Sequence, residues 1–180
     1  EWVNIDLVQY PGVLKCDVRE GIPFEDGWVE AILCIHMLDH LDIIKEAIPF
    51  LKECRRVMAE GAVMRLGVMD LEEILKVYQA GDMERYAQHQ RMSFQSAKSQ
   101  SLKLAIFLFG NQSKEKEYLG HKGLYTAESL EESLRLAGFT DVKKATYQVS
   151  SRLLSQRQPL ITTPTTRCTW RRYDDQCASA

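Results

Sequence analysis

The sequence reads WVNIDL at residues 2–7, VLKCDV at residues 13–18 and WVEAILCI at residues 28–35. The first stretch alternates well enough for a strand, and the third is mostly apolar, which is typical of a strand buried on both faces of a parallel sheet. Asp6 and Asp17 follow the first two strands directly. In an open parallel sheet, ligands bind in the crevice beyond the carboxyl ends of the strands. The pattern therefore predicts a ligand crevice with both acids at its edge.

The middle of the chain continues the alternation of strand and helix. Residues 36–61 read as helix, with Pro49 separating or kinking two stretches and Gly61 ending the second. The apolar run AVMRLGVM at residues 62–69 predicts another strand.

Two further helices have recognisable starts. Asp70 is a predicted N-cap for an amphipathic helix over residues 71–82. A second helix begins near Thr126 and ends at Gly138, and residues 140–149 alternate as a last strand. We therefore predict an α/β fold, with a Rossmann-like, mostly parallel sheet and flanking helices.

The length and composition of the chain fit a single domain. The chain has 180 residues, 45% of them hydrophobic and 27% charged, which suits a single hydrophobic core. We expect a domain over residues 1–150, followed by a polar, basic tail at 151–180 that carries five arginines against two aspartates.

Charge, hydropathy and cysteine content exclude several classes of protein. The formal net charge of −2 gives no general attraction to nucleic acid or to acidic membranes. No apolar run approaches the roughly 18 residues that a membrane span requires. The five cysteines are odd in number and form no CxxC pair, which favours a reduced, cytoplasmic setting.

Asp6 and Asp17 are the first candidate binding residues. A carboxylate after the second strand of a nucleoside-binding fold accepts hydrogen bonds from both ribose hydroxyls, because it offers two acceptors to a vicinal diol. An acid in the position of Asp17 can accept from an adenine amino group. Each acid alone reads more simply as a turn or helix cap, but their order before a third, apolar strand is a stronger signal for binding than either acid alone.

Two histidines invite a metal interpretation. His36 and His40 are four residues apart, so a helix would place both imidazoles on one face, with Asp39 close by. The zinc motif HExxH has Glu directly after its first His, however, and Met37 stands there. No third ligand is evident, and we predict no metal site.

The motifs and their order resemble class I S-adenosylmethionine-dependent methyltransferases. CDVREGIPF at residues 16–24, CIHMLDHL at 34–41 and ECRRVMAEG at 53–61 are similar to a small bacterial group that reads roughly D(L)REGLPF, HxLEHL and ECRRVLKPGG there. GHKGLYTAESLEESLRLAGFTDV at residues 120–142 is similar to the end of the same group. The resemblance covers about residues 1–151.

The resemblance implies an S-adenosylmethionine site at the carboxyl edge of the sheet. Asp6 matches the ribose-binding acid, Asp17 the adenine-side acid, and residues 34–36 the strand end where the methionine part of the cofactor meets the substrate. Arg55 and Arg56 match structural positions, with Glu53 as an expected ion-pair partner. The residues that the resemblance assigns to the cofactor are Asp6, Leu7, Asp17, Val18, Cys34, Ile35 and His36.

The chain also departs from the family pattern. The group's Pro-Gly-Gly turn is Ala-Glu-Gly-Ala at residues 59–62, and its VPD is Val-Met-Asp at 68–70. In the family, a first strand and a glycine-rich loop precede the strand at residues 2–7, whereas the ten glycines here form no such loop. Three consequences are expected as alternatives. The two neighbouring strands pair directly, a second copy donates a strand in a homodimer, or the chain is a trimmed product.

The expected function is methyl transfer to an unidentified small molecule or glycan. Methyl transfer from a sulfonium depends mainly on alignment, and a base helps when the nucleophile is a hydroxyl or an ammonium. His36, by location, and His121, in the glycine-bounded GHKG loop, are the candidate bases, although both also read as ordinary surface histidines. The alternative is a truncated or degenerate methyltransferase fold that acts as an interaction module. A nicotinamide-dependent enzyme ranks last.

Overall fold

The computed structural model describes residues 2–89, 94, 97–109, 120–144 and 167–171 of the chain. Its strands are β1 (Asn4–Asp6), β2 (Val13–Lys15), β3 (Val29–Ile35), β4 (Met58–Gly67), β5 (Asp141–Lys144) and β6 (Arg167–Arg171). Its helices are η1 (Leu38–His40), η2 (Ile43–Ala47), α1 (Ile48–Val57), α2 (Leu71–Gln79), α3 (Met83–His89), α4 (Gln100–Phe109) and α5 (Ala127–Leu136). The predicted α/β, Rossmann-like class is confirmed.

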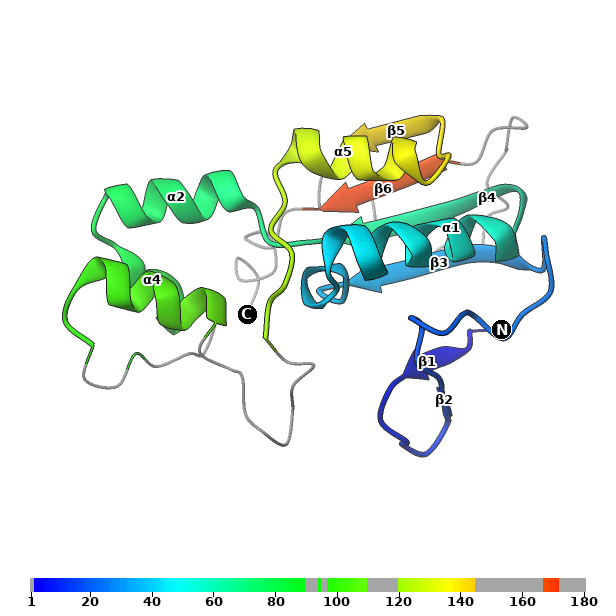
Figure 1. Ribbon diagram of the computed structural model, residues 1–180, viewed down its shortest axis with the longest axis horizontal. Coiled ribbons are helices and arrows are strands. Elements are labelled where there is room, and N and C mark those ends of the chain that lie inside the picture. The colour runs from blue at the N-terminus through cyan, green and yellow to red at the C-terminus, as the bar shows by residue number, and fades with distance from the viewer. Residues whose placement is uncertain (1, 90–93, 95–96, 110–119, 145–166, 172–180) are drawn as a thin grey trace.

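The strands form two parallel sheets. The larger has the order β3-β4-β6-β5, and all its neighbouring pairs are parallel. The smaller consists of β1 and β2, also parallel, and it lies beyond β3 rather than beside it in a common ladder (Figure 1). Direct pairing between β1 and β3, one of the expected ways of closing the sheet, is not what the structure shows.

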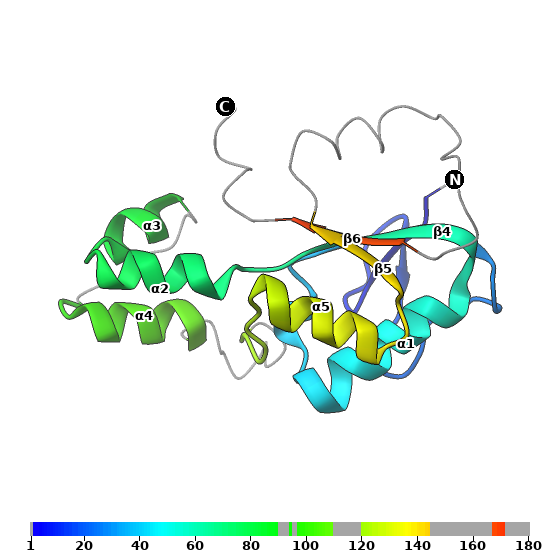
Figure 2. The ribbon, with the colours of Figure 1, turned by 90° about the horizontal axis from the view of Figure 1, so that it is seen from above.

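Helices α1 and α5 cover one face of the larger sheet, as both views show (Figures 1 and 2). Phe50, Leu51, Cys54 and Val57 of α1 are all buried, because their spacing places them along one side of the helix. Pro49 lies in the first turn of α1, where a missing N–H costs no hydrogen bond, and it separates α1 from η2 as predicted.

The end of α1 differs from the prediction. The helix ends at Val57 and β4 begins at once, instead of a helix that runs on to Gly61. Gly61 has a φ of 77° and lies where the pairing of β4 with β3 is irregular. The glycine is thus used for a bulge inside the strand rather than for a helix end.

Residues 167–171 correct the predicted tail. We expected residues 151–180 to lie outside the fold, but residues 167–171 form β6, which pairs with β4 on one side and β5 on the other. The sequence RCTWR alternates polar and apolar residues with a period of two, which suits a strand. The predicted last strand is β5, and residues 145–149 lie outside the described part of the chain.

Helices α2, α3 and α4 form a separate layer beyond the carboxyl end of β4 (Figure 2). They enclose a second core of Met69, Ile74, Met83, Phe94, Phe107 and Leu108. The Asp70 carboxylate accepts from Glu72 N at 3.0 Å, so the predicted N-cap of α2 is confirmed. Thr126 caps α5 in a reciprocal pair with Ser129. Among the described residues, no helix is long and apolar enough to cross a membrane.

Candidate functional site

A cleft of about 1160 Å³ separates the two sheets. One wall is residues 2–7, which include β1, and the other is residues 28–37, which include β3. Buried side chains of α1, among them Phe50 and Cys54, also line it. All seven residues that the sequence assigned to a cofactor line this one cleft: Asp6, Leu7, Asp17, Val18, Cys34, Ile35 and His36. The topology therefore gathers residues that are up to 30 positions apart in the chain.

Asp6 lies at the end of β1 with an exposed side chain. Its Oδ1 accepts from Val8 N at 2.8 Å, which closes a local turn. Its Oδ2 makes no hydrogen bond to any described residue. The carboxylate is therefore fixed in direction by one oxygen while the other remains available to a ligand.

Asp17 is engaged by its neighbour Arg19. The Arg19 guanidinium donates through Nε to Asp17 Oδ1 at 2.8 Å and through Nη2 to Oδ2 at 2.5 Å, and Arg19 N also donates to Oδ1. These hydrogen bonds hold the pKa of Asp17 below its usual range. A ligand that used this carboxylate would have to share it with a bidentate arginine.

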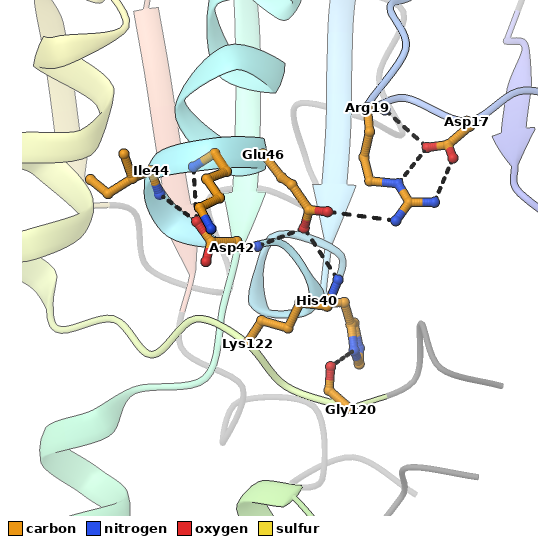
Figure 3. A network of polar contacts seen from close by, with 9 residues as sticks. Asp17, Arg19, His40, Asp42, Ile44, Glu46, Gly120 and Lys122 are labelled. Atoms are coloured by element: carbon orange, nitrogen blue, oxygen red, sulfur yellow. Dashed lines mark hydrogen bonds and ion pairs between the residues drawn. The ribbon is translucent and has the colours of Figure 1, made fainter. Parts of the chain in front are cut away.

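The pair belongs to a wider polar network at the mouth of the cleft (Figure 3). Arg19 lies 3.6 Å from Glu46 Oε1, and Glu46 Oε2 accepts from Lys122 Nζ at 3.3 Å and from Asp42 N at 2.8 Å. Three segments far apart in the sequence meet here: the loop after β2, the helix η2 and the segment that leads to α5. Opposite charges alternate along the network, which leaves little net charge at this end of the cleft.

His36 follows β3 directly and has an unusual backbone. Its φ is 52°, the one positive φ among described residues other than glycine. Its N–H donates to Gly67 O at 2.8 Å, so the turn is held against the end of β4. The imidazole Nδ1 lies 3.7 Å from Oδ2 of Asp39, a fully buried carboxylate. Strained backbone of this kind concentrates at functional sites.

Cys34 lies two residues before His36 and is almost fully buried. Burial, together with the nearby Asp39 charge, raises the pKa of its thiol to about 12. At neutral pH this cysteine is therefore a small apolar wall residue and no nucleophile.

His121, the second predicted base, is not among the residues that line the cleft. Its ring stacks on His40 with centroids 4.9 Å apart, and its Nδ1 lies 3.0 Å from Leu108 O. Burial lowers its pKa, because a partly buried imidazolium is poorly solvated. His40, on which His121 stacks, lines the cleft, so His121 contacts a lining residue without lining the cleft itself. Its role as a base stays a prediction.

The loop between β2 and β3 is anchored to α1 by Arg56. The guanidinium donates to Ile22 O and Phe24 O, both at 3.0 Å, and to Asp26 Oδ1 at 2.6 Å. It also bonds both carboxylate oxygens of Glu53, at 2.9 and 2.8 Å, which confirms the expected ion pair. The anchor fixes where the loop leaves the small sheet and enters β3.

Sequence reasoning missed three participants in this site: Arg19, Lys122 and the structural role of Asp39. Arg19 was detectable, since an arginine two residues after an acid in a loop often pairs with it. Lys122 reaches the cleft through tertiary packing, for which the sequence holds no local signal. Asp39 was noted as a neighbour of His36, but its burial could not be read from the sequence.

Comparison with known proteins gives one match. Residues 4–66, about a third of the chain, match the family model described as a methyltransferase domain. The matched segment contains the walls of the cleft and extends through α1 into β4. No curated protein and no solved structure matches the chain. The match confirms the resemblance to class I methyltransferases over this segment.

Proposed function

We propose that the protein transfers methyl groups from S-adenosylmethionine to a small molecule or a glycan, because residues 4–66 match the family model described as a methyltransferase domain. The observation that carries the proposal is the convergence of all seven predicted cofactor residues on one cleft between the two sheets. The match supports methyltransferase-like function, and the cleft geometry supports the choice of cofactor.

The residues fit this cofactor best at its ribose end. Asp6 offers a carboxylate with one oxygen available to a vicinal diol, at the end of a parallel strand. Val18 lies next to Asp17 and packs against the main core, so it supplies an apolar surface for a flat base. The volume of the cleft exceeds the range of about 300–1,000 Å³ that is typical of ligand pockets, which leaves space for an acceptor beside the cofactor.

The chain's own contribution to the chemistry is positioning and proton transfer. Bound S-adenosylmethionine supplies an electrophilic methyl group on a sulfonium. A hydroxyl or ammonium acceptor must lose a proton as it reacts, and His36 lines the cleft where it can receive that proton. Cys34 and Ile35 form the adjoining apolar wall, which restricts water near the reacting groups.

The acceptor proposal rests on the exposed aromatic rings of the cleft. The side chains of Trp2 and Trp28 are both 58% exposed and both line it. Trp28 is held by stacking on Phe24, with ring centroids 4.8 Å apart. Large aromatic faces of this kind contact rings and other flat apolar surfaces well, which suits a ring-containing small molecule or a sugar.

Two further proposals concern the setting of the protein. We propose a cytoplasmic location, because Cys16, Cys34 and Cys54 form no disulfide in the described part of the chain. We also propose a homodimer through sheet edges, because β3 pairs on one side alone among the described strands. Light scattering should then give twice the mass of one chain, and a monomer at high concentration would contradict the dimer.

The test of the proposed function is calorimetric titration with S-adenosylmethionine and S-adenosylhomocysteine. We expect micromolar binding by the unaltered chain. Asp6→Ala should weaken it about 10- to 100-fold, because a hydrogen bond to a charged group contributes roughly 1.5–3 kcal/mol. Asp82→Ala is the matched control, because Asp82 is an exposed acid that does not line the cleft. No binding by the unaltered chain would favour the non-catalytic alternative, an interaction module with a methyltransferase fold.

A further inference from the structure

The most buried carboxylate near the cleft is Asp39, to which neither the resemblance nor the proposed function gives a role. Asp39 is 0% exposed. Its Oδ1 accepts from Met69 N at 3.3 Å. Its Oδ2 makes no hydrogen bond within the described part of the chain. Because an unsatisfied buried carboxylate oxygen is costly, its persistence calls for a partner that completes it.

The backbone holds Asp39 in place independently of its side chain. Asp39 O accepts from Lys122 N at 2.8 Å and from Gly123 N at 3.0 Å, which ties η1 to the segment before α5. The residue is therefore fixed from two directions, through Met69 and through the segment at 122–123. A carboxylate so held can set the orientation of a more mobile neighbour.

That neighbour is His36. Its side chain is 27% exposed, and its Nδ1 lies 3.7 Å from Asp39 Oδ2. This distance is an ion-pair contact and about 0.5 Å longer than the upper end of a hydrogen bond. A small rotation of the imidazole closes it, and hydrogen bonds of this kind are often long before a substrate is bound.

We propose that Asp39 is a positioning residue that accepts a hydrogen bond from Nδ1–H of His36. This fixes the tautomer in which Nε2 is unprotonated and can take a proton. Only the identity of the proton donor, the methyl acceptor, rests on the proposed function. When the acceptor O–H or N–H bond breaks, its proton goes to Nε2, its electron pair stays on the attacking atom, and the Asp39 charge stabilises the imidazolium.

Two other side chains near Asp39 keep their protons and can donate a hydrogen bond. Burial together with the Asp39 charge raises the pKa of Tyr125, and its hydroxyl has no partner among the described residues, but Tyr125 does not line the cleft. Cys34 stays a thiol, which is a weak donor. His121 has its own contact to Leu108 O at 3.0 Å. His36 is thus the neighbour of Asp39 that both lines the cleft and brings a ring nitrogen to 3.7 Å from the unsatisfied oxygen.

The test is the ¹⁵N spectrum of the full chain labelled at histidine nitrogen, with the His36 signals assigned by their loss in His36→Gln. We expect the Nδ1–H tautomer in the unaltered protein, and a shift toward Nε2–H in Asp39→Asn, which keeps the size of the side chain. Asp42→Asn is the control, because the Asp42 carboxylate caps η2 by accepting from Ile44 N and Lys45 N. An Nε2–H tautomer in the unaltered chain would overturn the proposal even if Asp39→Asn failed to fold.

A kinetic readout separates this proposal from the proposed function. If a methyl acceptor is found, Asp39→Asn should lower kcat about 10²-fold with little change in KM, because His36 would then carry its proton on Nε2 and could not act as the general base. Unchanged kcat would contradict the positioning role. The tautomer measurement needs no cofactor and no acceptor. A chain that binds no S-adenosylmethionine but shows the Nδ1–H tautomer would therefore refute the proposed function and support the His36–Asp39 pair.

Discussion

Gly67→Ala tests whether the floor of the cleft is packed as tightly as the structure indicates. Gly67 is buried at the end of β4, directly opposite Ile35 in the register of the sheet. A Cβ added there would lie 2.9 Å from Ile35 Cδ1 and 3.3 Å from Ile35 Cγ2. The backbone of Gly67 has no positive φ, so alanine is allowed there and any loss of stability reports on packing.

The expected magnitude follows from two opposing effects. Overpacking a core by one methyl group costs about 1–3 kcal/mol. Alanine in place of glycine inside a strand restores about 0.5–1 kcal/mol of backbone entropy. We therefore expect a net loss of about 1–2 kcal/mol, which corresponds to a urea midpoint lower by about 0.5–1 M at a typical m-value.

A double-mutant cycle identifies the contact. Ile35→Val removes Cδ1, the nearer atom, while it keeps the Cγ2 branch, and by itself should cost about 0.5–1.5 kcal/mol. In the Ile35→Val background, Gly67→Ala should become nearly neutral, with a coupling of about 1 kcal/mol. Urea unfolding followed by circular dichroism measures all four proteins.

Two results would refute the reasoning. An equal loss in both backgrounds would show that Ile35 is not the obstacle. A neutral Gly67→Ala in the unaltered chain would show that Ile35 rotates freely into the cleft, which would then be looser at this point than its walls indicate.

Two other predictions concern titration. The pKa of Asp17 is lowered by Arg19, so its contribution to stability is present above its unfolded pKa of about 3.9 and is lost as pH falls through the folded value. The difference in unfolding free energy between Asp17→Asn and the unaltered chain should accordingly be full at neutral pH and shrink as the pH falls from the unfolded pKa through the lower folded one, and a constant difference would contradict the pairing. For Cys34, burial and a pKa of about 12 predict much slower alkylation than for the half-buried Cys16. Peptide mapping after iodoacetamide treatment at pH 8 checks this, with the unfolded chain as control, and equal native rates would contradict the burial.

Local periodicity was sufficient to predict the strands β1 to β5 and most helices, because their signals lie within a few residues. The strand at 29–35 and the caps Asp70 and Thr126 were found in this way. The end of α1 was placed too late, because Gly61 signals a turn without saying whether a helix or a strand contains it. Leu33, in a strand expected to be buried on both faces, is 47% exposed because β3 borders the cleft.

Long-range arrangement could not be predicted in the same way. The position of β6 between β4 and β5 depends on long-range pairing. Arg167 of β6 pairs with Val63 of β4, 104 residues earlier, and with Asp141 of β5, 26 residues earlier. The short alternating sequence of β6 has no local feature that selects this place. The convergence of the cofactor candidates was predictable, because acids at the ends of parallel strands share an edge. The bidentate hold of Arg19 on Asp17 depends on a side-chain geometry that the sequence leaves open.

The anchoring of the loop by Arg56 has a consequence for ligand affinity. Among the described residues, no strand pairing joins the two walls of the cleft, so the distance between them can vary. The loop of residues 16–28 and its attachment to α1 control this distance. A molecule that contacts Asp6 and His36 at once fixes the distance between the walls at one value. Part of its binding free energy is then spent on restricting the range of distances that the walls adopt without it. The guanidinium of Arg56, without touching the ligand, thus helps to determine how tightly it is held.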